Sequence, residues 1–306
     1  MLDCIVIGGG PAGLAAGLYL ARFKRSFVVV DAGAPRAAAI PKSHNIPLFP
    51  DGISGLDLLA RQRESLLRYA GGKLVHGRVA ALSRSGEGFC ARMAADGEDK
   101  QVDARRVILA TGAQDVEIPL PGLTDAVRRG IVRYCPICDG YEACGQKIGV
   151  ITRDARGLSE AAFIARTYHV AVTVLTLGEP LQASADELER AQGNGVKIQS
   201  APIRSLAIES DGVAAMDFES GVLRLDVLYS ALGLERRSEL AVVLGAIHDE
   251  GGALKTDKHQ QTSVEGLYAV GGVAEGLDQV LIAMGHAAIA ATHVHNHCDD
   301  GKAREI

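Results

Sequence analysis

Apolar runs separated by glycine turns dominate the N-terminal part of the chain. Leu2 to Ile7 is a short apolar run, Leu14 to Arg22 has apolar residues at helical spacing, and a second run from Ser26 to Val30 ends at Asp31. Short apolar runs bounded by turn residues are typical of buried strands, whereas a period of about 3.6 residues indicates a helix. This segment is therefore predicted to form a β-α-β unit.

The pattern continues through the middle of the chain with a predicted helix from Leu56 to Tyr69. Strands are predicted near Lys73 to Leu82, Phe89 to Ala94 and Gln101 to Val107, and a separate buried strand is predicted from Val107 to Ala113.

A proline-rich break from Pro119 to Gly122 predicts a linker before a second β-α-β unit. In that unit a strand from Lys147 to Ile151, a helix from Leu158 to Thr167 and a strand from Val170 to Leu175 follow one another. Further buried segments are Val227 to Gly233, Leu267 to Gly272 and a long apolar helix from Val280 to Asn296. Two such units in 306 residues predict an α/β protein with two Rossmann-like three-layer domains.

Composition and charge exclude several classes of protein. Hydrophobic residues make up 47% and the net charge is -5 without a basic block, which argues against nucleic acid and anionic membranes as partners. No apolar run reaches the roughly eighteen residues of a membrane span, and Met1-Leu2-Asp3 lacks the basic start of a signal peptide. Six cysteines are too sparse for a secreted disulfide scaffold, so we expect the protein to be located in the reducing cytoplasm.

The first turn carries the spacing Gly8-x-Gly10-x-x-Gly13, and Asp31 follows about 20 residues further on. Gly8 allows the tight turn, Gly10 lets the backbone approach a pyrophosphate, and Gly13 lets helix and strand pack closely. The helix start supplies amide donors, and Asp31 would accept hydrogen bonds from a ribose. A dinucleotide site is expected, although these residues alone do not distinguish FAD from NAD.

The second β-α-β unit repeats this topology, but the glycines of its turn are missing. Thr152, Arg153 and Asp154 would place Cβ atoms where a pyrophosphate needs bare backbone, and Asp154 would also repel it. No arginine cluster follows the next strand, so a 2′-phosphate would find no partner. We interpret the unit as a dinucleotide fold that has lost dinucleotide binding; the alternative, NAD(P)H held by other amides at the helix start, stays open.

Cys135 and Cys138, separated by two residues, can form a redox disulfide, half of a zinc site or inert core thiols. A structural zinc ion needs four ligands, yet the chain has no second Cys-x-x-Cys, and Cys144 is poorly spaced. Asp139 is placed to deliver or accept a proton for a departing thiolate. The redox disulfide is therefore favoured.

Histidines on the last predicted helix are a second candidate group. His293 and His297 share one helical face while His295 points elsewhere, so a solvated tail is favoured and no metal is expected. His286 could act as a base near the cysteines or near a cofactor. The alternative is a histidine that belongs to the core or to a dimer contact.

With these features in order, the chain resembles, nearly end to end, the low-molecular-weight thioredoxin reductase family of FAD-dependent disulfide oxidoreductases. The resemblance rests on the glycine motif with Asp31, on Ala110-Thr111-Gly112, on Cys135 to Gly140 and on Tyr268 to Ala291. It implies a homodimer and an FAD-binding domain in two pieces, 1–116 and 238–306. The inserted domain, 117–237, would resemble a nucleotide-binding domain and carry the cysteines.

The resemblance also implies roles for individual residues. Cys138 would be the flavin-facing thiol and Cys135 the interchange thiol, with Pro136 opening a helix whose free amides favour the Cys135 thiolate. Flavin contacts would come from the loop at His44-Asn45 and from the start of the last helix. The residues expected to bind FAD are Gly8, Gly10, Pro11, Ala12, Gly13, Asp31, Asn45, Val79, Ala110, Thr111, Gly112, Gly272, Asp278, Gln279 and Val280.

Two departures from the family pattern bear on function. The second glycine fingerprint is absent, and Gly272 stands where the family has an Asp that holds the ribityl chain. The flavin would therefore be held more weakly, or by neighbours such as Asp278. Cys135-Pro136-Ile137-Cys138 and the segment before Ala291 are more similar to a branch that includes thiol oxidases of small dithiol natural products and ferredoxin-fed reductases.

The expected function is therefore an FAD-dependent exchange of two electrons between flavin and a dithiol or disulfide through Cys135 and Cys138, without NADPH. The thiol partner would be a thioredoxin-like protein or a small dithiol, and the electron partner oxygen or ferredoxin. Two alternatives stay open: an NAD(P)H-dependent thioredoxin-disulfide reductase, and a flavoprotein redox sensor without turnover.

Overall fold

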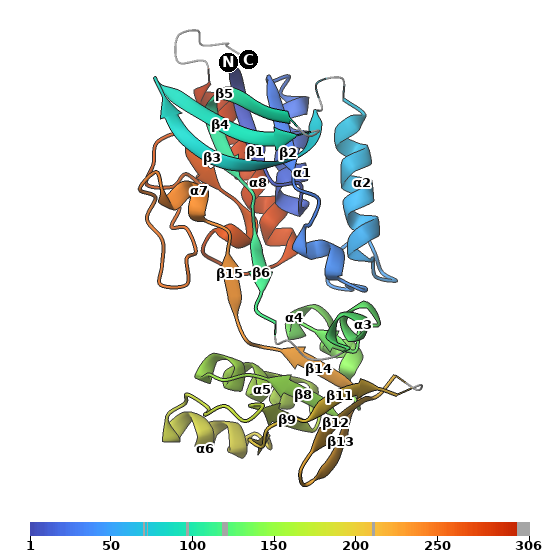
Figure 1. Cartoon of the computed structure of the whole chain (residues 1–306). Helices are drawn as coiled ribbons and strands as arrows, with labels where there is room; N and C mark the ends of the chain where they lie inside the picture. The colour runs from blue at the N-terminus through green and yellow to red at the C-terminus, as the bar shows by residue number, and fades with distance from the viewer. Residues whose placement is uncertain (70, 72, 96–97, 118–121, 210–211, 299–306) are drawn as a thin grey trace. The chain divides into compact units, whose positions relative to one another are not determined.

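The computed structural model describes residues 1–69, 71, 73–95, 98–117, 122–209 and 212–298 (Figure 1). The chain divides into two compact units. Unit 1 comprises Met1–Ala38, Gly55–Gln114 and Leu234–Ile306, and unit 2 comprises Ala39–Ser54 and Asp115–Gly233. Of the predicted linker, residues 119–121 lie outside the described part of the chain.

The parallel part of the unit 1 sheet places the N-terminal strand at its centre. β1 (Leu2–Ile7) pairs in parallel with β2 (Phe27–Asp31) on one side and with β5 (Glu98–Leu109) on the other, and β16 (Leu267–Ala269) continues the sheet beyond β5. All of β2 and most of β1 are buried, as expected for parallel strands covered on both faces. The carboxyl ends of β1 and β5 therefore lie side by side.

An antiparallel meander belongs to the same sheet. β3 (Leu74–Ser85) starts parallel to β2 and then pairs with β4 (Gly88–Ala95), which pairs with β5. The prediction of two separate strands between Gln101 and Ala113 is wrong, because β5 is continuous: its first half pairs with β4 and its last residues pair with β1 and β16.

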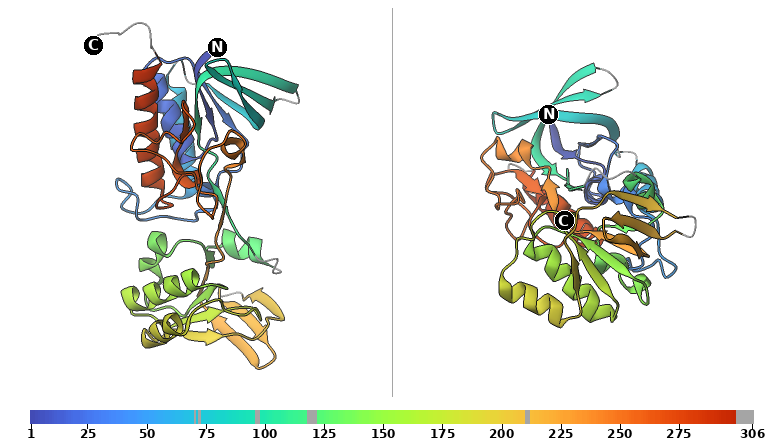
Figure 2. Two further views of the ribbon diagram at one scale, coloured as in Figure 1. Left: turned by 90° about the vertical axis from the view of Figure 1, so that its left-hand side faces the viewer. Right: turned by 60° about the horizontal axis from the view of Figure 1, so that its bottom comes forward.

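The parallel strands of unit 1 are covered by helices on one face and by the meander on the other (Figures 1 and 2). The helices are α1 (Pro11–Arg22), α2 (Gly55–Leu67) and α8 (Val280–His297). The opposite face of β1 and β2 packs into one core with residues of the meander, among them Phe89 and Met93. Shorter elements are η1 (Arg36–Ala39), β6 (Ala113–Asp115), β15 (Leu234–Arg236), α7 (Glu239–Val242) and η3 (Gly271–Val273).

Unit 2 has its own five-stranded parallel sheet in the order β10-β9-β8-β14-β7. The strands are β7 (Val132–Arg133), β8 (Ile148–Ile151), β9 (Val172–Leu175), β10 (Lys197–Gln199) and β14 (Val227–Ser230). The helices are α3 (Leu123–Arg128), α4 (Pro136–Asp139), η2 (Tyr141–Ala143), α5 (Ala155–Tyr168) and α6 (Ala185–Gly193), and an antiparallel sheet contains β11 (Ser205–Ile208), β12 (Ala214–Phe218) and β13 (Gly221–Leu225).

Alternate residues of the unit 2 strands enter two different cores. Val150 and Val174 pack with α5, whereas Ile151 and Leu175 pack with the antiparallel sheet and α3. Both units are thus three-layer α/β structures, which confirms the predicted fold class.

The prediction of a solvated histidine tail at the end of α8 holds for the exposed His297 but not for His293 and His295, which are partly buried in ring stacks. His293 stacks between His297, with ring centroids 3.9 Å apart, and His259, at 4.4 Å, and its Nδ1 lies 2.8 Å from the Tyr268 hydroxyl. His295 stacks on Phe23 instead.

Among the described residues no group of His, Cys, Asp and Glu side chains could hold a metal ion. Within the same residues, no helix has the length and apolar character to cross a membrane.

Candidate functional site

The turn between β1 and α1 is shaped by its glycines. Gly8 has φ +116°, and a Cβ there would lie 2.2 Å from the carbonyl oxygen of Ala110, at the end of neighbouring β5. A Cβ at Gly13 would lie 1.8 Å from the carbonyl oxygen of Gly8. At Gly10 a Cβ would meet only Pro35, at 3.7 Å. Gly8 and Gly13 are therefore required for packing, whereas Gly10 leaves space in front of the helix start.

The start of α1 offers free donors. Its N-cap is Gly10 and no side chain caps it within the described residues, while Pro11 opens the helix. The side chain of Gln62 reaches this point, because its Nε2 donates to the Pro11 carbonyl at 3.3 Å, yet its Oε1 is buried without a hydrogen-bond partner in the described structure. Uncapped amides at a helix start fit a pyrophosphate, whereas the orphaned Gln62 oxygen is an acceptor that needs a donor such as a hydroxyl group.

Asp31 lies beneath this turn at the end of β2. One carboxylate oxygen accepts from the Gly33 amide at 3.0 Å and the other from Arg63 Nη2 at 2.9 Å. Arg63 Nε is buried and unpaired within the described residues. A ribose at Asp31 would therefore meet the guanidinium of Arg63 as well, a residue that sequence reasoning missed because it lies on α2.

The other predicted flavin residues of unit 1 lie at three places. Ala110-Thr111-Gly112 follows β5 directly, and Thr111 Oγ1 donates to the Arg237 carbonyl at 2.5 Å. The side chain of Val79 is buried in the core of unit 1, beside the irregular pairing between Val79 and Ala81, so its main chain is what it could present to a cofactor. Gln279 is the N-cap of α8, and Val280 is the first helical residue.

A carboxylate does lie at Gly272, but another residue supplies it. A Cβ at Gly272 would be 3.1 Å from Asp278 Oδ1. Asp278 is held by both arms of the Arg236 guanidinium, at 2.6 and 3.0 Å, and Arg236 Nη1 also donates to the Gly272 carbonyl at 2.5 Å. Arg236 was not foreseen, because it is distant from Asp278 in the sequence.

The glycine-poor turn between β8 and α5 is closed by its own side chains. Asp154 is the N-cap of α5, and its Oδ1 accepts from the Gly157 amide at 2.9 Å. The expectation that all fingerprint glycines are missing is wrong for Gly157, where a Cβ would lie 2.0 Å from Thr152 Oγ1. Gly157 thus keeps the packing role that Gly13 has in unit 1, while a negative charge caps the amides.

Cys135 and Cys138 form a disulfide in unit 2. Cys135 is the N-cap of α4 and Pro136 its first residue, and the Cys138 amide donates to the Cys135 carbonyl at 2.9 Å. The predicted position of Cys135 at a helix start is therefore observed, and both cysteines are half-buried.

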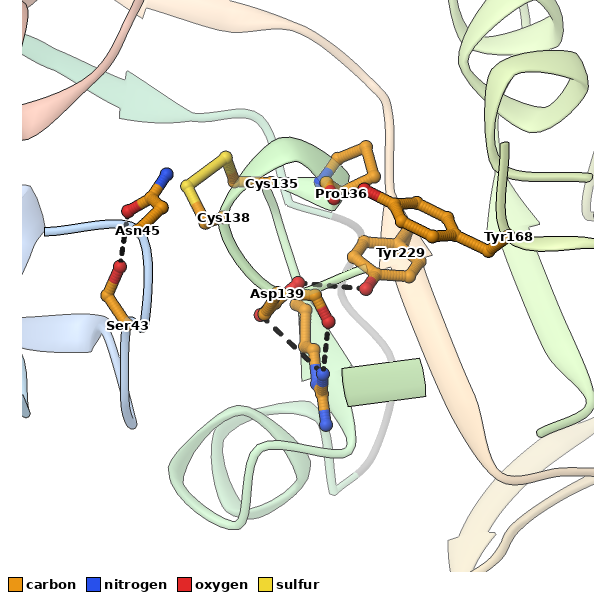
Figure 3. Close-up of a disulfide and its surroundings, with 9 residues drawn as sticks. Ser43, Asn45, Cys135, Pro136, Cys138, Asp139, Tyr168 and Tyr229 are labelled. Carbon is orange, nitrogen blue, oxygen red and sulfur yellow. Dashed lines mark hydrogen bonds and ion pairs between the residues drawn. A yellow bond between two sulfur atoms is a disulfide. The ribbon is translucent and has the colours of Figure 1, made fainter. Parts of the chain in front are cut away.

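Asp139, the last residue of α4, carries a shielded carboxylate. Its side chain is 13% exposed, Tyr229 donates to its Oδ1 at 2.8 Å, and Arg133 Nη1 lies 3.7 Å from its Oδ2 (Figure 3). Burial raises the pKa of Asp139 against the lowering effects of Arg133 and Tyr229. Burial also raises the pKa of Tyr229, so its hydroxyl stays a donor.

Two predicted residues belong to a different unit from the groups they were expected to assist or join. Asn45 belongs to unit 2, where its Oδ1 accepts from Ser43 at 2.7 Å (Figure 3), and the neighbouring His44 pairs with Glu142 at 3.1 Å. His286 lies on α8 of unit 1, and burial lowers its pKa. Its Nδ1 is buried without a partner among the described residues.

Known proteins resemble the whole chain. The thioredoxin reductase tcpT of Claviceps purpurea (strain 20.1) is 32% identical over 89% of this chain and 86% of its own length. The crystal structure of thioredoxin reductase from Streptococcus pyogenes MGAS5005 superposes with a TM-score of 0.87 at 27% identity and covers 97% of each chain.

An oxidoreductase from Agrobacterium tumefaciens gives a TM-score of 0.83 at 30% identity, covering 98% of this chain and 99% of its own. The family described as pyridine nucleotide-disulphide oxidoreductase matches residues 2–287. The chain therefore belongs to the pyridine nucleotide-disulphide oxidoreductase family, as a thioredoxin reductase-like flavin oxidoreductase that acts on disulfides.

Proposed function

We propose that the protein binds FAD in unit 1 and exchanges two electrons with a dithiol or disulfide through Cys135 and Cys138, without using NADPH. The observation that carries this proposal is the contrast between two helix starts. The start of α1 has free amides behind Gly10, whereas the start of α5 is capped by the carboxylate of Asp154. An anionic pyrophosphate is attracted to the first site and repelled from the second.

The residues of unit 1 each have a defined part in holding FAD. The amides of α1 would bind the pyrophosphate, Asp31 and Arg63 the ribose end, and Asp278, fixed by Arg236, the chain near Gly272. FAD supplies the two-electron redox partner for the disulfide. Cys135, at the start of α4, would exchange with the substrate, and Cys138 would be the thiol that exchanges electrons with the flavin.

Asp139 handles the proton of this exchange. A carboxyl with a raised pKa stays protonated to higher pH and can give its proton to a leaving thiolate. In the oxidising direction its carboxylate takes up the proton. The thiol partner is a thioredoxin-like protein or a small dithiol, and oxygen or a ferredoxin completes the electron path. We further propose that the enzyme is a cytoplasmic homodimer.

A second candidate is an NAD(P)H-dependent thioredoxin-disulfide reductase. It is supported by the names of the relatives, which are called thioredoxin reductases, and by Gly157, which retains the close helix–strand packing of a dinucleotide fold. In this case NAD(P)H would have to bind without the amide that Asp154 occupies.

Anaerobic mixing of the purified flavoprotein with one reductant at a time separates these candidates. We expect dithiothreitol to bleach the flavin, air to restore it, and stoichiometric NADPH or NADH to leave it oxidised on the same timescale. Cys138→Ser should abolish bleaching by the dithiol, while Cys144→Ser, at an exposed free cysteine, should leave it unchanged. Rapid bleaching by NADPH would overturn the NADPH-independent proposal, and dithiol bleaching that survives Cys138→Ser would overturn the cysteine mechanism.

A further inference from the structure

The register of the unit 2 sheet places a tyrosine and an arginine against the proton-handling carboxyl. Tyr229 on β14 and Arg133 on β7 are direct register partners in a parallel pair, so their side chains leave the sheet on the same face. Both reach Asp139, from its Oδ1 and Oδ2 sides. The Asp139 carboxyl is therefore held by side chains from two paired strands of the sheet, although it lies in a short helix.

The Arg133 side chain that contacts Asp139 is itself held in place by two further hydrogen bonds. Arg133 Nε donates to the Gly130 carbonyl at 2.8 Å and Arg133 Nη1 to the Asp139 carbonyl at 3.2 Å, so the guanidinium has little freedom. Tyr229 is 1% exposed; its hydroxyl donates to Asp139 and also interacts with the side chain of Arg133. A buried phenol needs a partner, and here that partner is a carboxylate directly after Cys138.

The other charged and titratable groups that face Asp139 are weaker influences. Glu142 raises its pKa and His44 lowers it, and these two residues pair with each other at 3.1 Å. The Tyr168 hydroxyl donates to the Pro136 carbonyl at 3.2 Å, so it is directed at the backbone of α4. Tyr229 and Arg133 are thus the groups that contact the carboxyl itself.

We propose that Tyr229 is a positioning residue of the thiol–disulfide centre, whose hydroxyl orients Asp139 and sets the pH at which it exchanges its proton. This inference rests on the proposed function of Cys135 and Cys138. Because the phenol donates to Oδ1, the ionised carboxylate is stabilised and its orientation is fixed.

The step that this arrangement serves is ordinary thiol–disulfide exchange. The Cys135 thiolate attacks a substrate disulfide, a mixed disulfide forms, and one substrate sulfur leaves as a thiolate. The Cys138 thiolate then attacks the Cys135 sulfur, the Cys135–Cys138 bond forms, and the second substrate sulfur leaves. The enzyme dithiol loses two electrons and the substrate gains them; Asp139 protonates one leaving thiolate and water the other.

Tyr229→Phe removes the hydroxyl and keeps the ring, so it tests the positioning role directly. Loss of a hydrogen bond to the carboxylate, with burial unchanged, should raise the pKa of Asp139 further, by about one to two pH units. We would titrate the protonated-carboxyl infrared band of the holoenzyme, identified by its loss in Asp139→Asn. In parallel, the rate at which the dithiothreitol-reduced enzyme reacts with an aromatic disulfide would be measured across pH. The limb of this pH–rate profile that reports Asp139 should shift to higher pH by the same amount as the infrared titration.

Matched variants make the outcome decisive. Tyr141→Phe removes an exposed hydroxyl two residues after Asp139 and should leave both titrations in place. Tyr229→Phe added to Asp139→Asn should have no further effect on the pH profile, because its target is gone. Site-specific 2,3-difluorotyrosine at position 229 keeps the shape and strengthens donation, so it should shift the titration of Asp139 downward even where the phenylalanine variant folds poorly.

Unchanged titration of Asp139 in Tyr229→Phe, or an equal shift in the Asp139→Asn background, would overturn the role of Tyr229 and leave the cysteine mechanism intact. Disulfide exchange that persists in Cys135→Ser would instead refute the proposed function, whatever the behaviour of Tyr229.

Discussion

Gly10 and Gly13 perform different tasks within one turn, although both belong to the same sequence motif. Gly13 is fixed by the Gly8 carbonyl, 1.8 Å from where its Cβ would be, so any side chain would force α1 away from β1. Gly10 has φ -77°, which any residue adopts, and open space at its Cβ. One glycine is therefore needed for the fold and the other for the ligand.

We expect Gly13→Ala to lower the free energy of unfolding by about 1–3 kcal/mol or more, because the helix must shift. Gly10→Ala should change it by less than about 1 kcal/mol but should lose bound flavin, because a methyl group then occupies the pyrophosphate position. Urea unfolding and the flavin-to-protein absorbance ratio measure the two effects. A Gly10→Ala protein that retains its flavin would contradict the placement of the pyrophosphate at this turn.

Side chains at the site could be predicted from the sequence only where spacing along the chain carries the information. The glycine motif, Asp31 and the helix start at Cys135 follow local rules and were found. Arg236 and Tyr229 were missed, because their partners Asp278 and Asp139 are distant in the sequence and meet only through the folded sheets.

Among the helices, α1 and α5 illustrate one supersecondary unit used in two ways. Both follow a parallel strand and both keep a glycine in the first turn, but only α5 has a side-chain cap among the described residues. A helix start with a carboxylate cap is more stable on its own, whereas an uncapped one leaves donors for a ligand. The difference in capping follows the proposed difference in function.

Asp154→Ala should therefore destabilise unit 2 by about 1 kcal/mol, because the Gly157 amide loses its acceptor. Asp154→Asn should preserve stability, since the asparagine oxygen accepts the same hydrogen bond without the charge. Chemical denaturation of the two variants checks this. If both variants lose the same stability, the charge of Asp154 rather than its hydrogen bond is what matters.

Strand lengths were the least predictable property of these elements. One strand was predicted to end at Val107, where the apolar run toward Ala113 begins, yet β5 runs from Glu98 to Leu109 without a break. The strand continues because it leaves the half-exposed meander and enters the buried parallel sheet, a change of neighbours that residue alternation alone does not reveal.

At the scale of the whole molecule, each unit has a hydrophobic core of its own, built on its own parallel sheet. Most residues proposed to bind FAD lie in unit 1, whereas both cysteines and Asp139 lie in unit 2. The chemistry is thus divided between two bodies that are stabilised by separate contacts. Ligand binding should then stabilise the units unequally.

Adding FAD to protein stripped of its flavin should raise the melting temperature of unit 1 selectively. At a hundredfold excess over Kd, binding contributes about 2.7 kcal/mol, which corresponds to roughly 5–10 °C for a unit of this size. Differential scanning calorimetry should resolve a transition that moves with FAD concentration and one that does not. Gly10→Ala serves as the control in which neither moves. A shift of both transitions together would show that FAD contacts hold the two units as one cooperative body.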